Sequence, residues 1–289
     1  MLYWIIIFFI ILGFAYDEIL SWLNIQASRK PVPDNLKDIY DKQEYERQQR
    51  YASEKRHLSM ISGGVETLAG LAVFSLGGLA IVDSLVGGLT SSPILKSVFF
   101  ILAFMWASNI IGLPFAYRET FNIEQKFGFN RSTPRLFLGD WVKGNMLSSC
   151  LTGGLMALFV WLYSLMPDYY WITAWTVMVS FMLVLQLVYS TLIVPLFNKQ
   201  KPLEEGELRS AIRKFARKVD FKLKDIYVMD GSKRSSKANA YFTGFGPSKR
   251  IVLYDTLIEQ LTTEEIVGVL AHEIGHYKHR HIVWHMVMS

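Results

Sequence analysis

The chain has 289 residues, of which 51% are hydrophobic and 19% are charged, and its mean hydropathy is +0.24. Soluble domains carry about 25% charged residues, so this balance argues against a large soluble enzyme and favours several membrane spans with one modest polar domain. The single cysteine, Cys150, excludes an internal disulfide framework and a thiolate-rich zinc site. The formal net charge of +5 is spread over loops beside apolar stretches, which argues against a nucleic-acid partner.

Five apolar stretches are long enough to cross a bilayer, which requires roughly 20 mostly apolar residues. The first is interpreted as an uncleaved span, because it lacks the basic start and the small-residue cleavage site of a signal peptide. Basic residues concentrate in the loops after the first and third spans, so the positive-inside tendency places these loops in the cytoplasm. The predicted spans cover about 2–24, 63–82, 97–117, 144–167 and 169–198.

A polar segment follows the fifth span. Residues 203–219 have apolar positions at helical spacing, with acids first and bases last, as the helix dipole favours. Two stretches, 225–231 and 250–257, have the composition of strands. The stretch 262–281 is typical of one helix, with Thr262 or Thr263 as its cap and two glutamates in its first turn.

These elements predict three parts of the chain. Residues 1–197 form a transmembrane region with about five spans, and residues 198–281 form a small α+β domain on the cytoplasmic side. Residues 282–289 begin another apolar run that has no stop signal, so we expect the chain to be a piece of a longer protein. The predicted fold class is therefore mainly α, a polytopic helical bundle with a small α+β domain.

The last predicted helix carries the pattern His-Glu-x-x-His, at His272, Glu273 and His276. Because an α-helix has 3.6 residues per turn, the two imidazoles project from one face and can reach one zinc ion. Glu273 then lies beside the open coordination position, where a carboxylate can take a proton from water and pass it to the leaving amine. The pattern predicts a zinc peptidase that hydrolyses peptide bonds with metal-activated water.

Two points about this site stay open from the residues alone. The pattern His-Glu-x-x-His fixes only three of five positions, so it also occurs by chance. In the competing interpretation, His272 and His276 are surface residues at the end of a helix and bind no metal. A catalytic zinc usually has three protein ligands, and a straight helix cannot bring His279, His281 or His285 onto the same ion. The third ligand is expected beyond Ser289, with an upstream acid as the alternative.

The ordered motifs resemble the type I CAAX prenyl proteases, which are membrane-embedded zinc endopeptidases. The resemblance covers nearly the whole chain and is most specific in its last two segments. Those segments include the His-Glu-x-x-His helix and the stretch before the second predicted strand. The matching segments are FNIEQKFGFN (121–130), VPLFNKQKPLEEGEL (194–208), GSKRSSKANAYFTGFGPSKRIVLYDTL (231–257) and VLAHEIGHYKHRH (269–281).

The resemblance implies a barrel of seven spans around a chamber, with one Zn²⁺ facing inward. It implies that His272 and His276 are zinc ligands, that Glu273 is the catalytic base and that a glutamate after residue 289 is the third ligand. It also implies that Asn239 and Ala240 hold the substrate backbone by strand addition. The implied substrate is a peptide with a prenylated C-terminal cysteine.

Two other functions remain as alternatives to a prenyl endopeptidase. One is a membrane-protein quality-control metalloprotease, and the other is a non-catalytic membrane protein that binds or transports metal. The short connection between residues 257 and 262 favours a bacterial inner membrane over the endoplasmic reticulum.

Overall fold

The computed structural model describes residues 2–33, 38, 41–243 and 249–279. Contacts divide the chain into two compact units, which are described separately below. The first unit comprises Met1–Gly128 and Pro134–Tyr170, and the second comprises Phe129–Thr133 and Trp171–Ser289.

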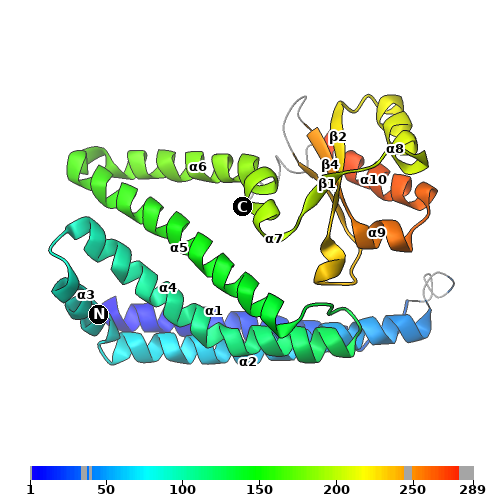
Figure 1. Ribbon diagram of the computed structural model, residues 1–289. Coiled ribbons are helices and arrows are strands. Elements are labelled where there is room, and N and C mark those ends of the chain that lie inside the picture. Colours follow the sequence, from blue (N-terminus) through cyan, green and yellow to red (C-terminus); the bar gives the residue numbers. More distant parts are fainter. Residues whose placement is uncertain (1, 34–37, 39–40, 244–248, 280–289) are drawn as a thin grey trace. The chain divides into compact units, whose positions relative to one another are not determined.

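Helices dominate the structure, and five of them are long and apolar enough to cross a membrane, as predicted (Figure 1). Several are continued by short helices of other types. The five are α1 (Leu2–Ala27), α2 (Lys42–Ser75), α4 (Pro93–Arg118) with η2 (Glu119–Glu124), α5 (Pro134–Leu165), and η3 (Pro167–Tyr169) with α6 (Tyr170–Val188), η4 (Tyr189–Ile193) and α7 (Val194–Phe197).

The second predicted span, 63–82, is not one helix. The helix that contains its first part, α2, starts much earlier, where Asp41 accepts hydrogen bonds from the backbone N–H groups of Gln43 and Glu44. It ends at Ser75, and Gly77 adopts the left-handed conformation with φ of 76°. This conformation, which glycine tolerates, breaks the helix, so the rest of the apolar run forms the separate short helix α3 (Gly78–Leu89).

In the first unit, α1 and α2 pack antiparallel to each other. The ring of Tyr3 stacks on Phe74, with centroids 5.2 Å apart. Near the other end of α1, a Cβ on Gly63 would lie 3.9 Å from Glu18 Oε1. The C-terminal end of α1 therefore lies beside the N-terminal turns of α2. Helices α4 and α5 also pack together, and the Asn109 Nδ2 group donates to Asn145 Oδ1 at 2.7 Å.

The second unit contains a four-stranded sheet with the order β1-β2-β4-β3. The two predicted strands correspond to β2 and β4, which pair in parallel, whereas β1 and β3 flank them in antiparallel pairing. The prediction of a strand through residue 257 is wrong, because Asp255 starts a helix and bonds the backbone N–H of Thr256. The elements are β1 (Gln200–Pro202), β2 (Leu223–Met229), η5 (Gly231–Lys233), β3 (Ala240–Thr243), β4 (Lys249–Tyr254) and α9 (Asp255–Gln260).

Two longer helices, α8 (Glu207–Lys218) and α10 (Thr263–Lys278), cover one face of this sheet (Figure 1). Residues 280 and 281, at the end of the predicted last helix, lie outside the described residues. The core between the helices and the sheet is aliphatic, and its innermost members are almost fully buried. They are Ile212, Ile226, Ile251, Leu253, Ile266 and Leu270.

Candidate active site

The helix α10 is anchored to the sheet by one apolar face. Ile266, Leu270 and Ile274, at a spacing of four residues, are 1%, 1% and 3% exposed. His272 and His276 each follow one of these anchors by two positions, which turns them by about 200° around the helix. Both histidines are therefore exposed on the face of α10 that points away from the core.

The two imidazoles meet on that exposed face. His272 Nε2 and His276 Nε2 are 3.0 Å apart, and the ring planes are perpendicular. Two zinc ligands at about 2.05 Å with tetrahedral geometry have nitrogen atoms about 3.3 Å apart, so the pair fits one zinc ion after a shift of a few tenths of an ångström. Among residues 2–33, 38, 41–243 and 249–279, no group of three metal-ligating side chains is assembled.

Glu273 follows the first histidine and is half-buried, unlike the two histidines beside it. The helix therefore carries an acid at the border between its buried and exposed faces. Among the described residues, a Cβ added at Gly275 would meet no heavy atom within 4 Å outside the backbone of its own helix. His281 and His285, which we did not expect to be ligands, lie outside the described residues.

The start of α10 is fixed by a reciprocal capping box. Thr262 Oγ1 accepts a hydrogen bond from the Glu265 backbone N–H, and Glu265 Oε2 accepts one from the Thr262 backbone N–H at 2.8 Å. The hydrogen bond from the Thr262 backbone, with a smaller contribution from its hydroxyl, lowers the pKa of the Glu265 carboxyl. Of the two predicted caps, the structure uses Thr262.

Asn239 and Ala240 lie at the start of β3, an outer strand of the sheet. The Asn239 carbonyl accepts from the Tyr254 N–H on β4, so residues 239, 241 and 243 direct their backbone groups toward β4. Ala240 and Phe242 consequently direct theirs toward the outer edge, where no described strand pairs with β3. The Asn239 side-chain oxygen accepts from the Ala240 N–H at 2.8 Å.

Side chains of β3 alternate between the two faces of the sheet. Ala240 is 8% exposed and packs in the core beneath α10. Tyr241 points the other way, toward Val194, Met229 and Val252. The strand therefore presents one face to the helix with the histidines and the other face to the helices α6 and α7.

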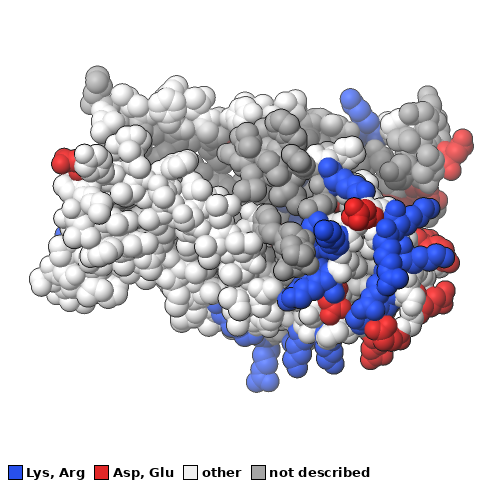
Figure 2. Space-filling view, turned by 90° about the horizontal axis from the view of Figure 1, so that it is seen from above, with Lys and Arg blue, Asp and Glu red and all other residues white. Residues whose placement is uncertain are grey.

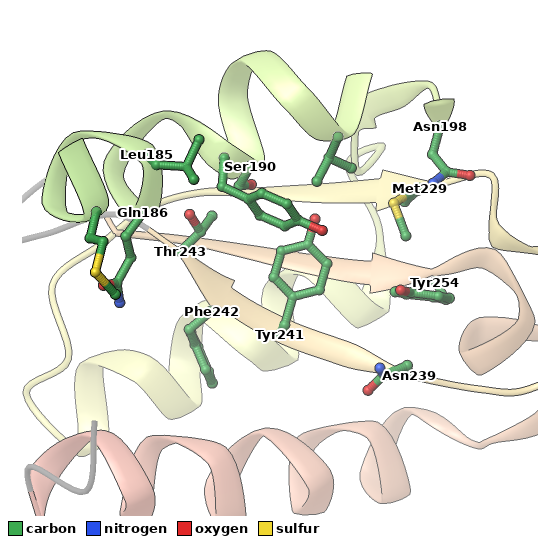
Figure 3. Close-up of a pocket in the computed structure, with 13 residues that line it drawn as sticks. Leu185, Gln186, Ser190, Asn198, Met229, Asn239, Tyr241, Phe242, Thr243 and Tyr254 are labelled. Atoms are coloured by element: carbon green, nitrogen blue, oxygen red, sulfur yellow. The ribbon is translucent and has the colours of Figure 1, made fainter. Parts of the chain in front are cut away.

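A pocket of about 620 Å³ lies on that second face, between the sheet and the helical stretch α6–α7 (Figure 3). Its walls are mainly apolar, and Tyr241 and Tyr254 line it from the sheet. Burial raises the pKa of both phenols, so they stay neutral at physiological pH. We did not predict this pocket, although the strand alternation that places Ala240 inward already implies that Tyr241 faces the opposite side.

The segment that leads into β3 is held from several sides. The Arg234 backbone carbonyl accepts from the Arg131 N–H, and the Ser236 N–H donates to the Phe129 carbonyl. The Lys237 carbonyl accepts from Thr256 Oγ1 at 2.9 Å. The loop 129–133 and the start of α9 therefore fix the path of the chain just before Asn239.

Charged side chains are distributed unevenly over the second unit. Figure 2 shows Lys and Arg side chains gathered over the part that contains the sheet and α8, whereas the surface over α6 carries none. From Tyr170 to Val188 the helix α6 contains no charged residue. This uncharged surface suits a helix surrounded by lipid.

Two family profiles match adjacent parts of the chain. Residues 21–199 match the profile described as CAAX prenyl protease N-terminal, five membrane helices, and residues 202–289 match the profile of Peptidase family M48.

Curated relatives match over almost the whole chain. The CAAX prenyl protease 1 homologs of Arabidopsis thaliana and Oryza sativa are 35% and 38% identical over 96% of this chain and 68% of their own length. CAAX prenyl protease 1 of Saccharomyces cerevisiae is 36% identical over 97% of this chain and 65% of its own length. The chain therefore spans about two thirds of these relatives.

Among solved structures, the crystal structure of S. mikatae Ste24p matches with a TM-score of 0.89 and 34% identity. The match covers 99% of this chain and 69% of that one. All these relatives are eukaryotic, so the expectation of a bacterial inner membrane is not supported. The expectation of an integral, multi-pass membrane protein is confirmed by the helices and by the matching profile.

Proposed function

The chain belongs to the CAAX prenyl protease family of membrane metalloendopeptidases, and from this premise we propose that its metal is zinc, held by His272 and His276, with Glu273 as the catalytic base. The observation that carries the proposal is the 3.0 Å separation of the two Nε2 atoms on the exposed face of α10. A third ligand, proposed to be a glutamate after Ser289, would complete the set.

Each residue of the motif has a separate task. His272 and His276 would hold the ion through their Nε2 atoms, and the buried Leu270 and Ile274 fix the turn of α10 that carries His272 and Glu273. When bound, zinc polarises the scissile carbonyl and acidifies water. Glu273 would take a proton from the attacking water at its carboxylate and deliver it to the nitrogen of the leaving amine.

We propose that the substrate adds as a strand to the outer edge of β3. The Ala240 carbonyl and the backbone groups of Phe242 point toward this edge, and Asn239 lies at its start. Because side chains of an added strand follow the same alternation as β3, those beside Tyr241 would point into the 620 Å³ pocket. Its apolar walls favour aliphatic side chains or a prenyl group over charged side chains.

The relatives are named for CAAX prenyl proteins, and we propose the same substrate class for this chain. We also propose that residues 1–197 form the membrane region and that residues 198–281 form a peptidase domain on the cytoplasmic side. A eukaryotic internal membrane such as the endoplasmic reticulum is then the expected location.

The decisive experiment replaces Glu273 with glutamine in the full-length protein. We expect the variant to lose cleavage of a prenylated peptide by at least about 100-fold while it keeps its zinc, because the base is lost but the ligands remain. Glu264→Gln, in the exposed first turn of the same helix, is the matched control and should cleave normally. Normal cleavage by the Glu273→Gln variant would refute the assignment.

The choice of substrate distinguishes a prenyl protease from a quality-control protease. The proposal predicts faster cleavage of a peptide with a farnesylated C-terminal cysteine than of the same peptide without the farnesyl group. Equal rates for the two peptides, together with cleavage of unfolded membrane proteins, would favour quality control instead.

A further inference from the structure

A second cavity, of about 870 Å³, lies in the first unit where α1 and α2 diverge. One wall is the stretch Ser28–Val32, directly after the end of α1. The other wall is one face of α2, whose lining residues follow each other at intervals of three, one, three, one and three positions. Such spacing places them on one side of a helix. They are Lys42, Tyr45, Glu46, Gln49, Arg50 and Ser53.

The cavity is strongly basic. Arg29, Lys30, Lys42 and Arg50 line it, and Glu46 is the only acid among its lining residues. The formal charge of the lining is thus 4 − 1 = +3. Within the described residues, the structure records no ion pair for any of the four cations.

On the opposite face of α2, by contrast, basic side chains do have partners. There, Arg47 Nη2 donates to the Phe127 carbonyl at 2.6 Å, and Lys55 pairs with Glu119 at 2.5 Å. The same helix therefore pairs Lys55 with an acid of η2, whereas the structure records no ion pair for Lys42 or Arg50 among the described residues on the cavity face, although Glu46 lies there. Like charges gathered in this way repel each other until an anion neutralises them.

The position of the cavity identifies the source of the anion. Because α1 and α2 are antiparallel, the basic residues after α1 and the first turns of α2 lie at the same end of the pair. The helix α1 ends at Ala27, two residues before Arg29, and after Arg56 the only charged residue of α2 is Glu66. The cavity consequently lies at the level where lipid headgroups meet water.

The lining also provides hydrogen-bonding groups suited to a phosphate ester. Arg50 and Arg29 can each present two parallel N–H groups to phosphate oxygens. Ser53 and Gln49 add neutral polar groups on the same face of α2. Val32, which is 9% exposed, gives the cavity an apolar base.

We propose that this cavity binds the headgroup of an anionic phospholipid. The lipid would bridge the end of α1 and the start of α2 on the side where positive loops are expected. The proposal concerns a site in the first unit and does not depend on the proposed protease function, because it is tested by lipid binding and not by cleavage.

The test uses the full chain in a neutral detergent and counts bound lipid by native mass spectrometry. The probes are dioctanoyl phosphatidylserine, dioctanoyl phosphatidylcholine and inorganic phosphate. We compare the unmodified chain with the triple variant Arg29→Gln, Lys30→Gln, Arg50→Gln. The matched control removes the same charge from the exposed part of α8, as Lys214→Gln, Arg217→Gln, Lys218→Gln.

We expect the unmodified chain and the control to bind phosphatidylserine more tightly than phosphatidylcholine, and the triple variant to bind it at least about ten-fold more weakly. Gln49→Trp fills the cavity without changing any charge and should also weaken binding. This single variant covers the case in which the triple variant does not fold.

Three results would overturn the proposal. An equal loss in the control would show that binding depends on net charge and not on the cavity. Displacement of the lipid by inorganic phosphate at similar concentrations would show a site for small anions. Unchanged phosphatidylserine binding in Gln49→Trp and in a folded triple variant would place the lipid elsewhere.

Discussion

Arg234 and Asn198 connect the segment before β3 to the end of the fifth membrane-length helix. Arg234 Nη1 donates to Asn198 Oδ1 at 2.5 Å, and its Nη2 donates to the Phe197 carbonyl at 2.7 Å. The guanidinium thus satisfies a carbonyl in the last turn of α7, where no intrahelical donor is available. Asn198 also lines the pocket beside β3, so this contact links the pocket wall to the path of the edge strand.

Replacing Arg234 with methionine should destabilise the second unit. Two charge-assisted hydrogen bonds are lost and the Phe197 carbonyl loses its donor, so we expect a loss of about 2 kcal/mol in unfolding free energy. Chemical unfolding in detergent measures the effect. Lys233→Met, at the exposed neighbouring position, should change stability by less than about 0.5 kcal/mol. Equal losses in both variants would mean that the Arg234 contacts add nothing specific.

Zinc content should depend on each histidine of α10. His272→Ala or His276→Ala removes one imidazole, and a single remaining ligand on the helix cannot hold the ion at micromolar zinc. We expect zinc per protein, measured by elemental analysis of the purified full-length protein, to fall from about one to near zero. His279→Ala should retain zinc, and loss of the metal there would require a different ligand set.

Glycine is required at position 231 and not at position 268. A Cβ on Gly231 would lie 2.5 Å from Tyr254 Cδ2, so Gly231→Ala must displace a ring that lines the pocket. We expect destabilisation of about 1–3 kcal/mol. A Cβ on Gly268, within α10, would meet no described atom within 4 Å, and Gly268→Ala should stabilise the helix by up to about 1 kcal/mol. Thermal unfolding of both variants should therefore shift in opposite directions.

The capping box makes the stability of the folded chain depend on pH, and the direction of this dependence follows from the lowered pKa of Glu265. The pKa of Glu265 is lowered in the folded chain, so its contribution to stability is present above the unfolded pKa near 4.3 and is lost as pH falls through the lowered value. Glu265→Gln should therefore flatten the acid side of the stability profile, whereas Glu264→Gln should change it less. Unfolding at pH values from 7 to 3 measures the difference, and identical profiles for both variants would contradict the assignment.

Sequence patterns predicted long elements well and their boundaries less well. The five apolar stretches and the helix with His272 and His276 follow from hydropathy and from a 3.6-residue period, which are local signals. The break after Ser75 was missed because Gly77 lies inside an apolar run, where hydropathy alone cannot distinguish one helix from two. The helical start at Asp255 does not follow from the apolar run 251–254, because that run predicts a strand without showing where the strand ends.

In the candidate site, too, local features could be predicted from the sequence and long-range features could not. His272 and His276 meet because four residues make about one turn, so their proximity needed no tertiary information. The pocket behind β3 joins Met182 and Ser190 to Asn239 and Tyr254, which are far apart in sequence, and no local pattern brings them together. The roles of Asn239 and Ala240 remain predictions, supported by the position of β3 at the outside of the sheet.

In the part of the chain that the structure describes, the outer strand β3 covers Ala240–Thr243, and its first N–H is bonded to Asn239 Oδ1. That bond leaves one N–H fewer on the outer edge for a second copy of the chain or a guest peptide to pair with. Backbone hydrogen bonds to such an edge are the same for every guest sequence. Discrimination between guests must then depend on what their side groups meet on either side of the sheet.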